Sequence, residues 1–341
     1  MFTYFNSFLT LIYLSPQLLV SIFVSAKQRT MNFKTLPQLL DYFKKDEVCV
    51  KYYEQLRWNG NPVCPHCGAE KPYVTTRGYK CSDNKCYKKF TCKVGTIFEN
   101  SKIPFRTWFA AIYLATSSKK GISSVLLAEQ LGITQKTAWF VLHRVREMLK
   151  NQAPDMVGGN GNMVEADETY IGGKEKNRHT KKRRSQDNPE LANDGTPYNK
   201  KKVVLGLVER GGKVVLRLVP NAQESNMVPF IQDYLPDGSH IVTDEHVSYQ
   251  NLGKIYTHET VTHSLRVYVN GNAHTNTIEN FWSVLKRGIN GIYHQVSEKH
   301  LERYLNEFAG RYNSRDINSY ERFEQFLKDA EGGLLYKNLI S

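Results

Sequence analysis

Apolar residues between positions 274 and 292 recur at steps of three and four, which is the spacing of one face of an α-helix. Glu279 and Lys286 lie two turns apart on the polar side of this predicted helix. A carboxylate and an ammonium so placed can serve a divalent metal and a neighbouring phosphate, although a solvated helix face with an incidental ion pair has the same pattern. The apolar stripe consists of Ile278, Phe281, Trp282, Leu285, Ile289 and Ile292.

Upstream of this helix, β-branched runs bounded by turn residues predict strands over residues 163–173 and 239–246. Between them, two apolar runs flank Arg210-Gly211-Gly212 and predict a hairpin, which is followed by a helix over residues 224–234. Asp167 lies within the first strand. Asp244 lies at the C-terminal end of the other, where α/β sheets place their ligand sites.

The predicted order is a strand with Asp167, a hairpin, a helix, a strand with Asp244 and a helix with Glu279. This is the layout of a ribonuclease-H-like α/β core with a mixed sheet. Three carboxylates that converge on one edge of a sheet can hold two Mg²⁺ or Mn²⁺ ions for an in-line phosphoryl displacement. Glu165 and Glu168 are rival candidates for the role of Asp167, and a structural ion pair with a lysine is the alternative to any metal site.

Nearer the N-terminus, apolar spacing predicts two short helices over residues 36–58 and an amphipathic helix over residues 104–116. Ser123 or Ser124 is expected to cap the next helix, and Thr134 caps one over residues 135–150, so the pair has a helix-turn-helix signature. The second helix is expected to read base edges, unless the three helices are only a packing unit. Its outward residues are expected to be Gln135, Lys136, Trp139, His143, Arg144 and Arg146; DNA contact is assigned to Gln135, Lys136, Arg144 and Arg146.

The cysteine spacing predicts a structural zinc site. Cys64 and Cys67 form a knuckle, and Cys81 and Cys86 supply a second pair, so four thiolates can surround one Zn²⁺. Cys49 and Cys92 are expected not to be ligands, although Cys92 could replace Cys86. Four protein ligands leave no open position for water, so this zinc is expected to support folding and DNA contact. Lysines and aromatic residues around the second knuckle favour backbone binding, with solubility as the alternative; Lys88 and Lys89 are the assigned contacts.

Composition favours a polyanionic partner in a reducing compartment. The chain of 341 residues has 46 Lys and Arg against 33 Asp and Glu, a formal net charge of +13. A ribosomal or membrane-surface protein would have a similar balance. Six cysteines, of which four are clustered, favour metal binding over a disulfide scaffold.

The sequence predicts an α+β chain of several domains. Residues 1–30 are uncharged over their first 26 positions and are interpreted as a non-native upstream extension, since Met31 begins the recognisable sequence. Residues 31–98 then hold helices and the zinc ribbon, and residues 99–150 the helix-turn-helix. Residues 151–162 are predicted to be a flexible linker. Residues 163–331 form the catalytic domain, which includes a basic insertion at 174–202 and later helices that cover the sheet.

The motifs resemble those of the DDE insertion-sequence transposases of the ISXO-two-like group, which carry an N-terminal zinc ribbon. The resemblance rests on the runs 164–173, 242–245, 274–279 and 281–288, and with the N-terminal motifs it covers about residues 31–315. It implies a catalytic triad of Asp167, Asp244 and Glu279, with Lys286 near the DNA backbone. Asn280 stands where the family usually has Gly, and some relatives use Asn as the third catalytic residue. Asn276 or Asn280 could therefore share the role of Glu279.

We therefore expect a DNA transposase that binds element ends, cleaves them and joins the 3′ ends to target DNA. Lys286 would position a phosphate and Arg287 would support it electrostatically. The expected partners are double-stranded DNA and further copies of the chain, without a membrane, and the expected location is cytoplasmic, or nuclear in a eukaryotic host. The rival interpretation is a non-catalytic regulator in which the zinc ribbon and helix-turn-helix bind DNA; metal binding by the three acids would distinguish the two.

Overall fold

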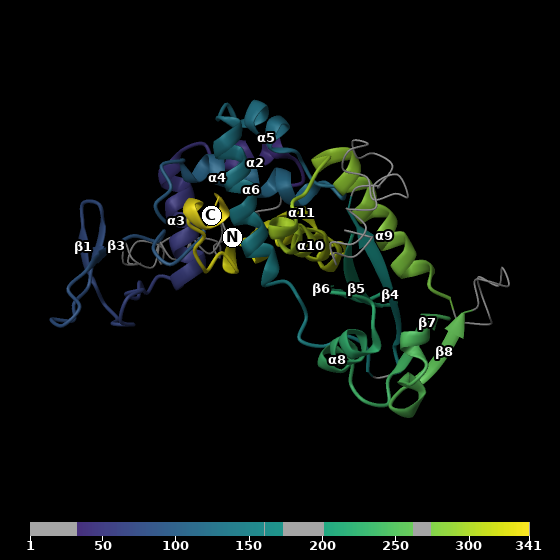
Figure 1. Ribbon diagram of the computed structural model, residues 1–341. Helices are drawn as coiled ribbons and strands as arrows, with labels where there is room; N and C mark the ends of the chain where they lie inside the picture. The colour runs from purple at the N-terminus through teal and green to yellow at the C-terminus, as the bar shows by residue number, and fades with distance from the viewer. Residues whose placement is uncertain (1–32, 160, 173–200, 262–273, 341) are drawn as a thin grey trace, which may run out of the picture.

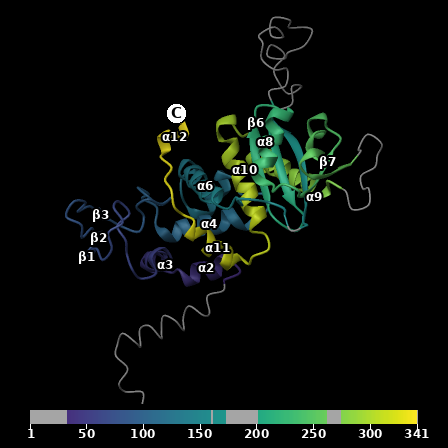
Figure 2. The same cartoon turned by 90° about the horizontal axis from the view of Figure 1, so that it is seen from below.

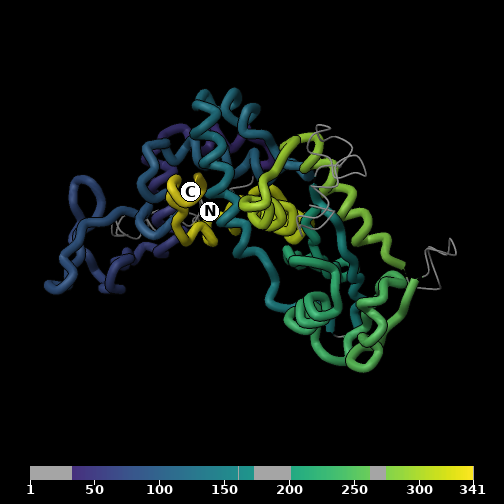
Figure 3. Tube along the Cα trace, viewed as in Figure 1, coloured from purple at the N-terminus to yellow at the C-terminus, as the bar shows by residue number. Residues whose placement is uncertain are grey.

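The computed structural model describes residues 33–159, 161–172, 201–261 and 274–340. Three parts lie in a row: a small antiparallel sheet at one end, a group of helices in the middle, and a mixed sheet with its covering helices at the other end (Figure 1, Figure 3). Within these ranges no helix is both long enough and apolar enough to cross a bilayer. The predictions for residues 1–30 and for nearly all of the insertion at 174–202 lie outside the described residues.

The central part is built around one aromatic-rich core. Its helices bury Phe43, Trp108, Phe109 and Met148 among other apolar side chains. The caps follow the sequence, because the hydroxyl of Ser123 accepts from the amide of Leu126 and that of Thr134 accepts from Thr137. The helices are α2 (Leu36–Tyr42), α3 (Asp46–Trp58), α4 (Phe105–Ser117), α5 (Ser124–Leu131) and α6 (Gln135–Lys150).

A three-stranded antiparallel sheet projects from the end of α3 (Figure 1). Its strands are β1 (Tyr73–Thr75), β2 (Gly78–Lys80) and β3 (Lys89–Phe90). Trp58 packs edge-on against Tyr79 and Phe90, and these rings form most of the small apolar cluster beside the cysteines. So little buried apolar surface cannot hold a fold by itself, which is why such modules need a metal.

The large sheet has five strands in the order β6-β5-β4-β7-β8. β4 pairs antiparallel with β5, and β5 antiparallel with β6, whereas β4, β7 and β8 run parallel. This is the mixed ribonuclease-H-like sheet that the sequence predicts, with one strand, β8, that it does not. The strands are β4 (Met163–Ile171), β5 (Lys202–Glu209), β6 (Val214–Val219), β7 (His240–Asp244) and β8 (Thr257–Val261).

Helices cover both faces of the sheet (Figure 2). Side chains alternate along β5, so Leu205 and Leu207 pack with α8 (Glu224–Tyr234) while Val204 and Val208 pack with the opposite layer. That opposite layer consists of α9 (Asn276–Gly288), the π-helical turn Ile289–Tyr293 that follows it, and α10 (Glu298–Asn313). α9 packs on this face of the sheet against β4 and β5.

Two predictions about domain organisation are wrong. α11 (Ser319–Lys328) does not cover the sheet, because its buried Phe323, Phe326 and Leu327 belong to the core of the central helices. The segment 151–162 is not a free linker, because its described residues are bonded on both sides. Asn151 donates to the carbonyl oxygen of Asp329, and the amide of Val157 donates to that of Tyr234. The last helix, α12 (Tyr336–Ile340), lies near α6 (Figure 2).

Candidate functional site

Two of the predicted acids meet at one edge of the sheet. β4 and β7 run parallel with Glu165 opposite Val242. Continued by two residues, this register sets Asp167 beside Asp244, with both side chains on the face that α9 covers. Asp244 is the last residue of β7, and its own side chain also accepts from the amide of His246 at 3.0 Å. The strand order therefore produces the predicted pair of adjacent carboxylates.

The carboxylate of Asp167 is held from two sides. One oxygen accepts from the amide of Glu168 at 2.8 Å, and the other accepts from the indole nitrogen of Trp282 on α9 at 2.9 Å. Burial, and then the charges of Glu168 and Asp244, raise the pKa of Asp167 to about 7. A cation bound at this edge would relieve that repulsion, so hard oxygen donors with uncompensated charge fit a divalent ion.

Glu168 belongs to the same acidic cluster but faces the other side of β4. The hydroxyl of the buried Tyr249 donates to its carboxylate at 3.0 Å, and a ring nitrogen of His246 lies 4.0 Å away. Burial and the charge of Asp244 raise the pKa of Glu168, whereas His246 and the Tyr249 hydrogen bond act in the opposite direction. Glu168 thus remains near the candidate ion site, although its direct partner is a tyrosine.

Glu165, the other rival of Asp167, has a structural position. Its fully buried carboxylate accepts from the amides of Thr277 and Ile278 at 2.8 and 2.9 Å. The guanidinium of Arg210 donates to it at 2.7 Å, and a ring nitrogen of His274 lies 3.1 Å away. Glu165 therefore satisfies the first turn of α9 and fixes this helix to β4, a role that the sequence pattern did not indicate.

The third predicted acid lies on α9. At roughly 100° per residue, Glu279, Trp282 and Lys286 share one flank of the helix, the flank from which Trp282 reaches Asp167. The exposed carboxylate of Glu279 accepts from the hydroxyl of Thr275 at 2.9 Å. Among the described residues, the four cysteines form a group whose ligand atoms are close enough to share one ion. The carboxylate oxygens of Asp167, Asp244 and Glu279 do not form such a group. The structure therefore brings the two aspartates together and sets Glu279 on the facing helix.

Other predicted residues of α9 divide between its flanks. Lys286 and Arg287 are exposed, and the guanidinium of Arg287 donates back to the backbone and hydroxyl oxygens of Ser283. Asn280 lies about 200° around the helix from Trp282, on the flank away from Asp167. Asn276 is exposed in the first turn.

A glycine that the sequence analysis missed shapes this site. A Cβ atom on Gly206 of β5 would lie 2.7 Å from two ring atoms of Trp282. Only glycine lets the indole lie flat enough against the sheet to reach Asp167. A glycine inside an otherwise continuous apolar strand is the signal that could have indicated this close approach.

The four predicted cysteine ligands come together. The sulfur atoms of Cys64, Cys67, Cys81 and Cys86 all lie within 4.8 Å of one another. Sulfur atoms around a tetrahedral zinc are about 3.8 Å apart, given Zn–S bonds of about 2.3 Å. The measured separations of 3.9 Å for Cys64 and Cys86 and 3.4 Å for Cys67 and Cys81 fit that geometry. Cys49 and Cys92 are buried elsewhere, so the cluster contains Cys86 and not Cys92.

Besides Arg287, four of the predicted DNA contacts are exposed. Lys88 and Lys89 lie on the surface of the small sheet. Gln135 and Lys136 lie at the start of α6. The side-chain amide nitrogen of Gln135 donates to the hydroxyl of Ser124, and the ammonium of Lys136 lies 5.0 Å from the centroid of the Tyr336 ring.

The prediction that Arg144 and Arg146 face outward is wrong. Arg144 is 3% exposed and donates to the carbonyl oxygens of Ile97, Glu99 and Leu334. Arg146 is 1% exposed and forms a buried ion pair with Glu307 of α10 at 2.6 Å. His143 is likewise buried, and burial lowers its pKa to about 2. α10 covers Arg146, and the backbone near Ile97 and Leu334 covers Arg144, so both arginines serve the fold.

Comparisons with known proteins agree with this architecture. The family described as ISXO2-like transposase domain matches residues 158–313, and the transposase zinc-ribbon domain matches residues 44–93. An uncharacterized protein in transposable element ISH50 of Halobacterium salinarum is 29% identical over 277 residues, which cover 79% of this chain and 91% of that protein. An uncharacterized transposase-like protein of Haemophilus influenzae is 32% identical over 108 residues, or 31% of this chain and 86% of that protein.

Two solved structures are distantly similar. A pre-cleavage Mos1 transpososome is 13% identical with a TM-score of 0.23, over 68% of this chain and 82% of that chain. A mariner Mos1 paired end complex with Mg is 13% identical with a TM-score of 0.24, over 92% of this chain and 97% of that chain. Such low scores add nothing to the family matches. On the two family matches and the relatives, this chain belongs to the ISXO2-like transposases and carries their zinc-ribbon domain ahead of the transposase domain.

Proposed function

We propose that this chain cleaves the ends of its insertion sequence and joins their 3′-hydroxyls to target DNA. The observation that carries the proposal is the pair of neighbouring carboxylates, Asp167 and Asp244, just beyond the last paired residues of the parallel strands β4 and β7 in a transposase-family domain. Bringing acids this close costs free energy unless a cation or a proton relieves it. A site of this kind is typical of divalent-metal chemistry on phosphate esters.

Each acid has a separate role in this proposal. Asp167 and Asp244 would hold the ions, and Glu279 would complete the ligand set from α9. The ions, when bound, would activate the attacking oxygen and stabilise the leaving one. Trp282 orients Asp167 through its indole hydrogen bond. Lys286 lies on the same flank as Glu279, about 10 Å further along the helix axis, where it would contact a DNA phosphate and Arg287 would add positive charge.

Recognition of the element's ends would lie in the other two parts. Four thiolates would hold one structural zinc and so fold the small sheet, whose Lys88 and Lys89 face the surface. Gln135 and Lys136, at the N-terminal end of α6, would contact base edges. The partners would be double-stranded DNA and further copies of this chain on that DNA.

A cleavage and joining assay separates the enzyme from the regulator. The substrate is a labelled duplex that carries the element's own end, incubated with wild-type protein in Mg²⁺ or in EDTA. A gel-shift on the same DNA runs in parallel. We expect Mg²⁺-dependent nicking and joined products. Tight, specific binding without any cleavage would instead support a non-catalytic zinc-ribbon and helix-turn-helix regulator.

The third ligand can be tested in the same assay. Glu279→Gln keeps the shape of the side chain and removes its charge, and it should lower joining strongly while DNA binding persists. Asn280→Ala should lower joining far less than Glu279→Gln, because Asn280 lies on the other flank of α9, away from Asp167. Strong activity of Glu279→Gln together with loss in Asn276→Ala or Asn280→Ala would move the third role to that asparagine.

A further inference from the structure

A pocket of about 300 Å³ opens on the flank of α9 that faces away from Asp167. Its volume is at the lower end of the range for small-molecule sites. Asn280, Phe281 and Val284 supply its α9 wall, and α10 with the turn after α4 supplies the rest. The remaining lining residues are Lys119, Phe308, Arg311, Tyr312 and Arg315.

The lining is positively charged. Lys119, Arg311 and Arg315 contribute three cations, and no acidic residue is among the lining residues that the structure describes. Arg315 donates to the carbonyl oxygen of Gly212 at 2.8 Å and lies 3.5 Å from Asp316, whose side chain is 75% exposed. Phe281, Val284 and Phe308 add an apolar wall beside these cations.

Arg311 is the buried member of this set. Its side chain is 4% exposed, and one of its terminal nitrogens contacts Glu307 and the carbonyl oxygen of Ala115. Its other two nitrogens, Nε and one Nη, have no hydrogen-bond partner among the described residues. A buried guanidinium with unused donors is costly, so an acceptor that reached these nitrogens would lower that cost.

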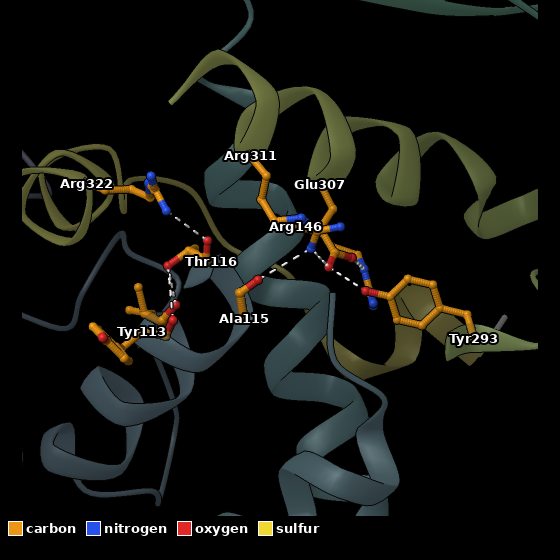
Figure 4. Close-up of polar contacts among 9 residues, drawn as sticks. Tyr113, Ala115, Thr116, Arg146, Tyr293, Glu307, Arg311 and Arg322 are labelled. Carbon is orange, nitrogen blue, oxygen red and sulfur yellow. Dashed lines mark hydrogen bonds and ion pairs between the residues drawn. The ribbon is translucent and has the colours of Figure 1, made fainter. Parts of the chain in front are cut away.

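The surrounding ion pairs do not supply that acceptor. Arg311 of α10 and Arg146 of α6 converge on the single carboxylate of Glu307, which also accepts from the hydroxyl of Tyr293 at 2.5 Å (Figure 4). Burial opposes ionisation of Glu307, but the two arginines outweigh it and hold its pKa below the usual value. Two buried cations and one anion leave an excess positive charge next to the pocket.

The pocket is separate from the acidic edge. Asn280 and Val284 lie on one flank of α9, and Glu279, Trp282 and Lys286 lie on the other, so the body of the helix stands between the pocket and Asp167. A ligand here would not replace the metal ions. It would contact α9, the helix that carries Glu279, on the flank opposite Glu279. There it would lie between the turn at Lys119 and the end of α10.

We propose that this pocket binds the phosphate group of a nucleotide unit. The phosphate would take hydrogen bonds from Lys119, Arg311 and Asn280, and the sugar would lie against Phe281 and Val284. Phosphate is the anion that best uses several converging donors, and arginine is suited to its geometry. The phosphate can come from the DNA backbone or from a free nucleotide. Only the backbone source rests on the proposed function.

The first test uses inorganic phosphate and the full chain without DNA. Isothermal titration at constant ionic strength, balanced with NaCl, should show one saturable site. Lys119→Gln should weaken that affinity by about tenfold or more, because it removes a charge-assisted hydrogen bond. Lys254→Gln makes the same change of charge at an exposed position outside the lining and should keep the affinity. Both side chains are exposed, and circular dichroism checks that both variants are folded.

Two outcomes would overturn the proposal: no saturable phosphate binding by the wild-type chain, or an equal loss in Lys119→Gln and Lys254→Gln. Asn280→Ala is a second check. It should weaken phosphate binding although it does not change the net charge. A failure to bind phosphate would not bear on strand cleavage, which a separate assay measures. It is therefore distinguishable from a failure of the proposed function.

The second test identifies the source of the phosphate. Ethylation of single phosphates in a bound duplex should reveal a position at which modification weakens binding to the wild-type chain and to Lys254→Gln but not to Lys119→Gln. Inorganic phosphate should compete with that DNA phosphate for the pocket. If the titrated site binds phosphate and no such position exists, a free nucleotide or phosphate is the ligand, and deoxynucleoside monophosphates should then bind more tightly than inorganic phosphate.

Discussion

Truncating Glu165 to alanine should destabilise the catalytic domain, because this one carboxylate joins β4 to α9. It accepts from the amides of Thr277 and Ile278, in the first turn of the helix, and it is paired with Arg210 at 2.7 Å. The substitution leaves those amides without a side-chain acceptor and leaves the guanidinium without its carboxylate. It also frees the end of the helix that carries Glu279.

The expected loss is about 3 kcal/mol. Removing one partner of a buried ion pair costs about 3–5 kcal/mol, and losing a helix cap costs about 1 kcal/mol. The Arg210 side chain is 21% exposed, so water can partly replace its partner, and the lower end of the range applies. For a domain of this size the melting temperature should fall by about 6–12 °C. Glu165→Gln, which keeps an acceptor oxygen, should lose about half as much.

Thermal melting followed by circular dichroism measures this effect, and Asp233→Ala is the matched control. Asp233 also pairs with an arginine at 2.7 Å, but its side chain is 55% exposed and that of Arg217 is 37% exposed, so the control should lose at most about 1 kcal/mol. An unchanged melting temperature for Glu165→Ala would refute the structural role. If that variant also failed to join DNA ends, Glu165 would become a candidate metal ligand.

Three further predictions follow from the zinc site, the sheet and the exposed lysines. The full chain should contain about one zinc, and Cys64→Ser should lose it and make the small sheet sensitive to protease while the rest resists; metal analysis that finds no zinc in the wild-type chain would contradict the site. Gly206→Ala should cost about 1–3 kcal/mol and reduce joining, because the new methyl displaces Trp282 from Asp167, and a variant that melts and joins like the wild type would refute this. Replacing Lys88 and Lys89 together with glutamine should lower the slope of log affinity against log salt by roughly 2, as expected for two lost phosphate contacts, whereas an unchanged slope would remove them from the interface.

The regular elements of the catalytic domain could be predicted because each has a strong local pattern. The hairpin at Arg210-Gly211-Gly212 and the helix Glu224–Tyr234 are found where the turn residues and apolar spacing indicate. β8 was not predicted, because Thr257, His258 and Glu259 give this edge strand no apolar run. Periodicity reports burial, and a half-exposed edge strand has little of it.

Packing partners were harder to predict than elements. The amphipathic pattern of α11 shows that one face is buried, but it does not say whether that face meets the sheet or the central helices. The orientation of Arg144 and Arg146 on α6 could not be predicted, because a buried arginine that pairs with Glu307 or with backbone carbonyls has the same sequence pattern as one that contacts DNA.

In the candidate site, too, some features could be predicted from the sequence and others could not. Strand order and register place Asp167 beside Asp244, since each lies two residues after the last parallel pair, Glu165 and Val242. The indole hydrogen bond to Asp167 and the cap that Glu165 makes on α9 join residues more than a hundred positions apart, so no local pattern contains them.

Strand joining by aspartate-to-asparagine variants tests the central claim most directly. Asp167→Asn and Asp244→Asn keep side-chain volume and remove charge, and Asp233→Asn is the matched control away from the edge. With a labelled element end in Mg²⁺, the first two should bind DNA like the wild type but lose joining by at least about a hundredfold, whereas the control should join normally. Undiminished joining by Asp167→Asn or Asp244→Asn would contradict the assignment of the chemistry to this edge of the sheet.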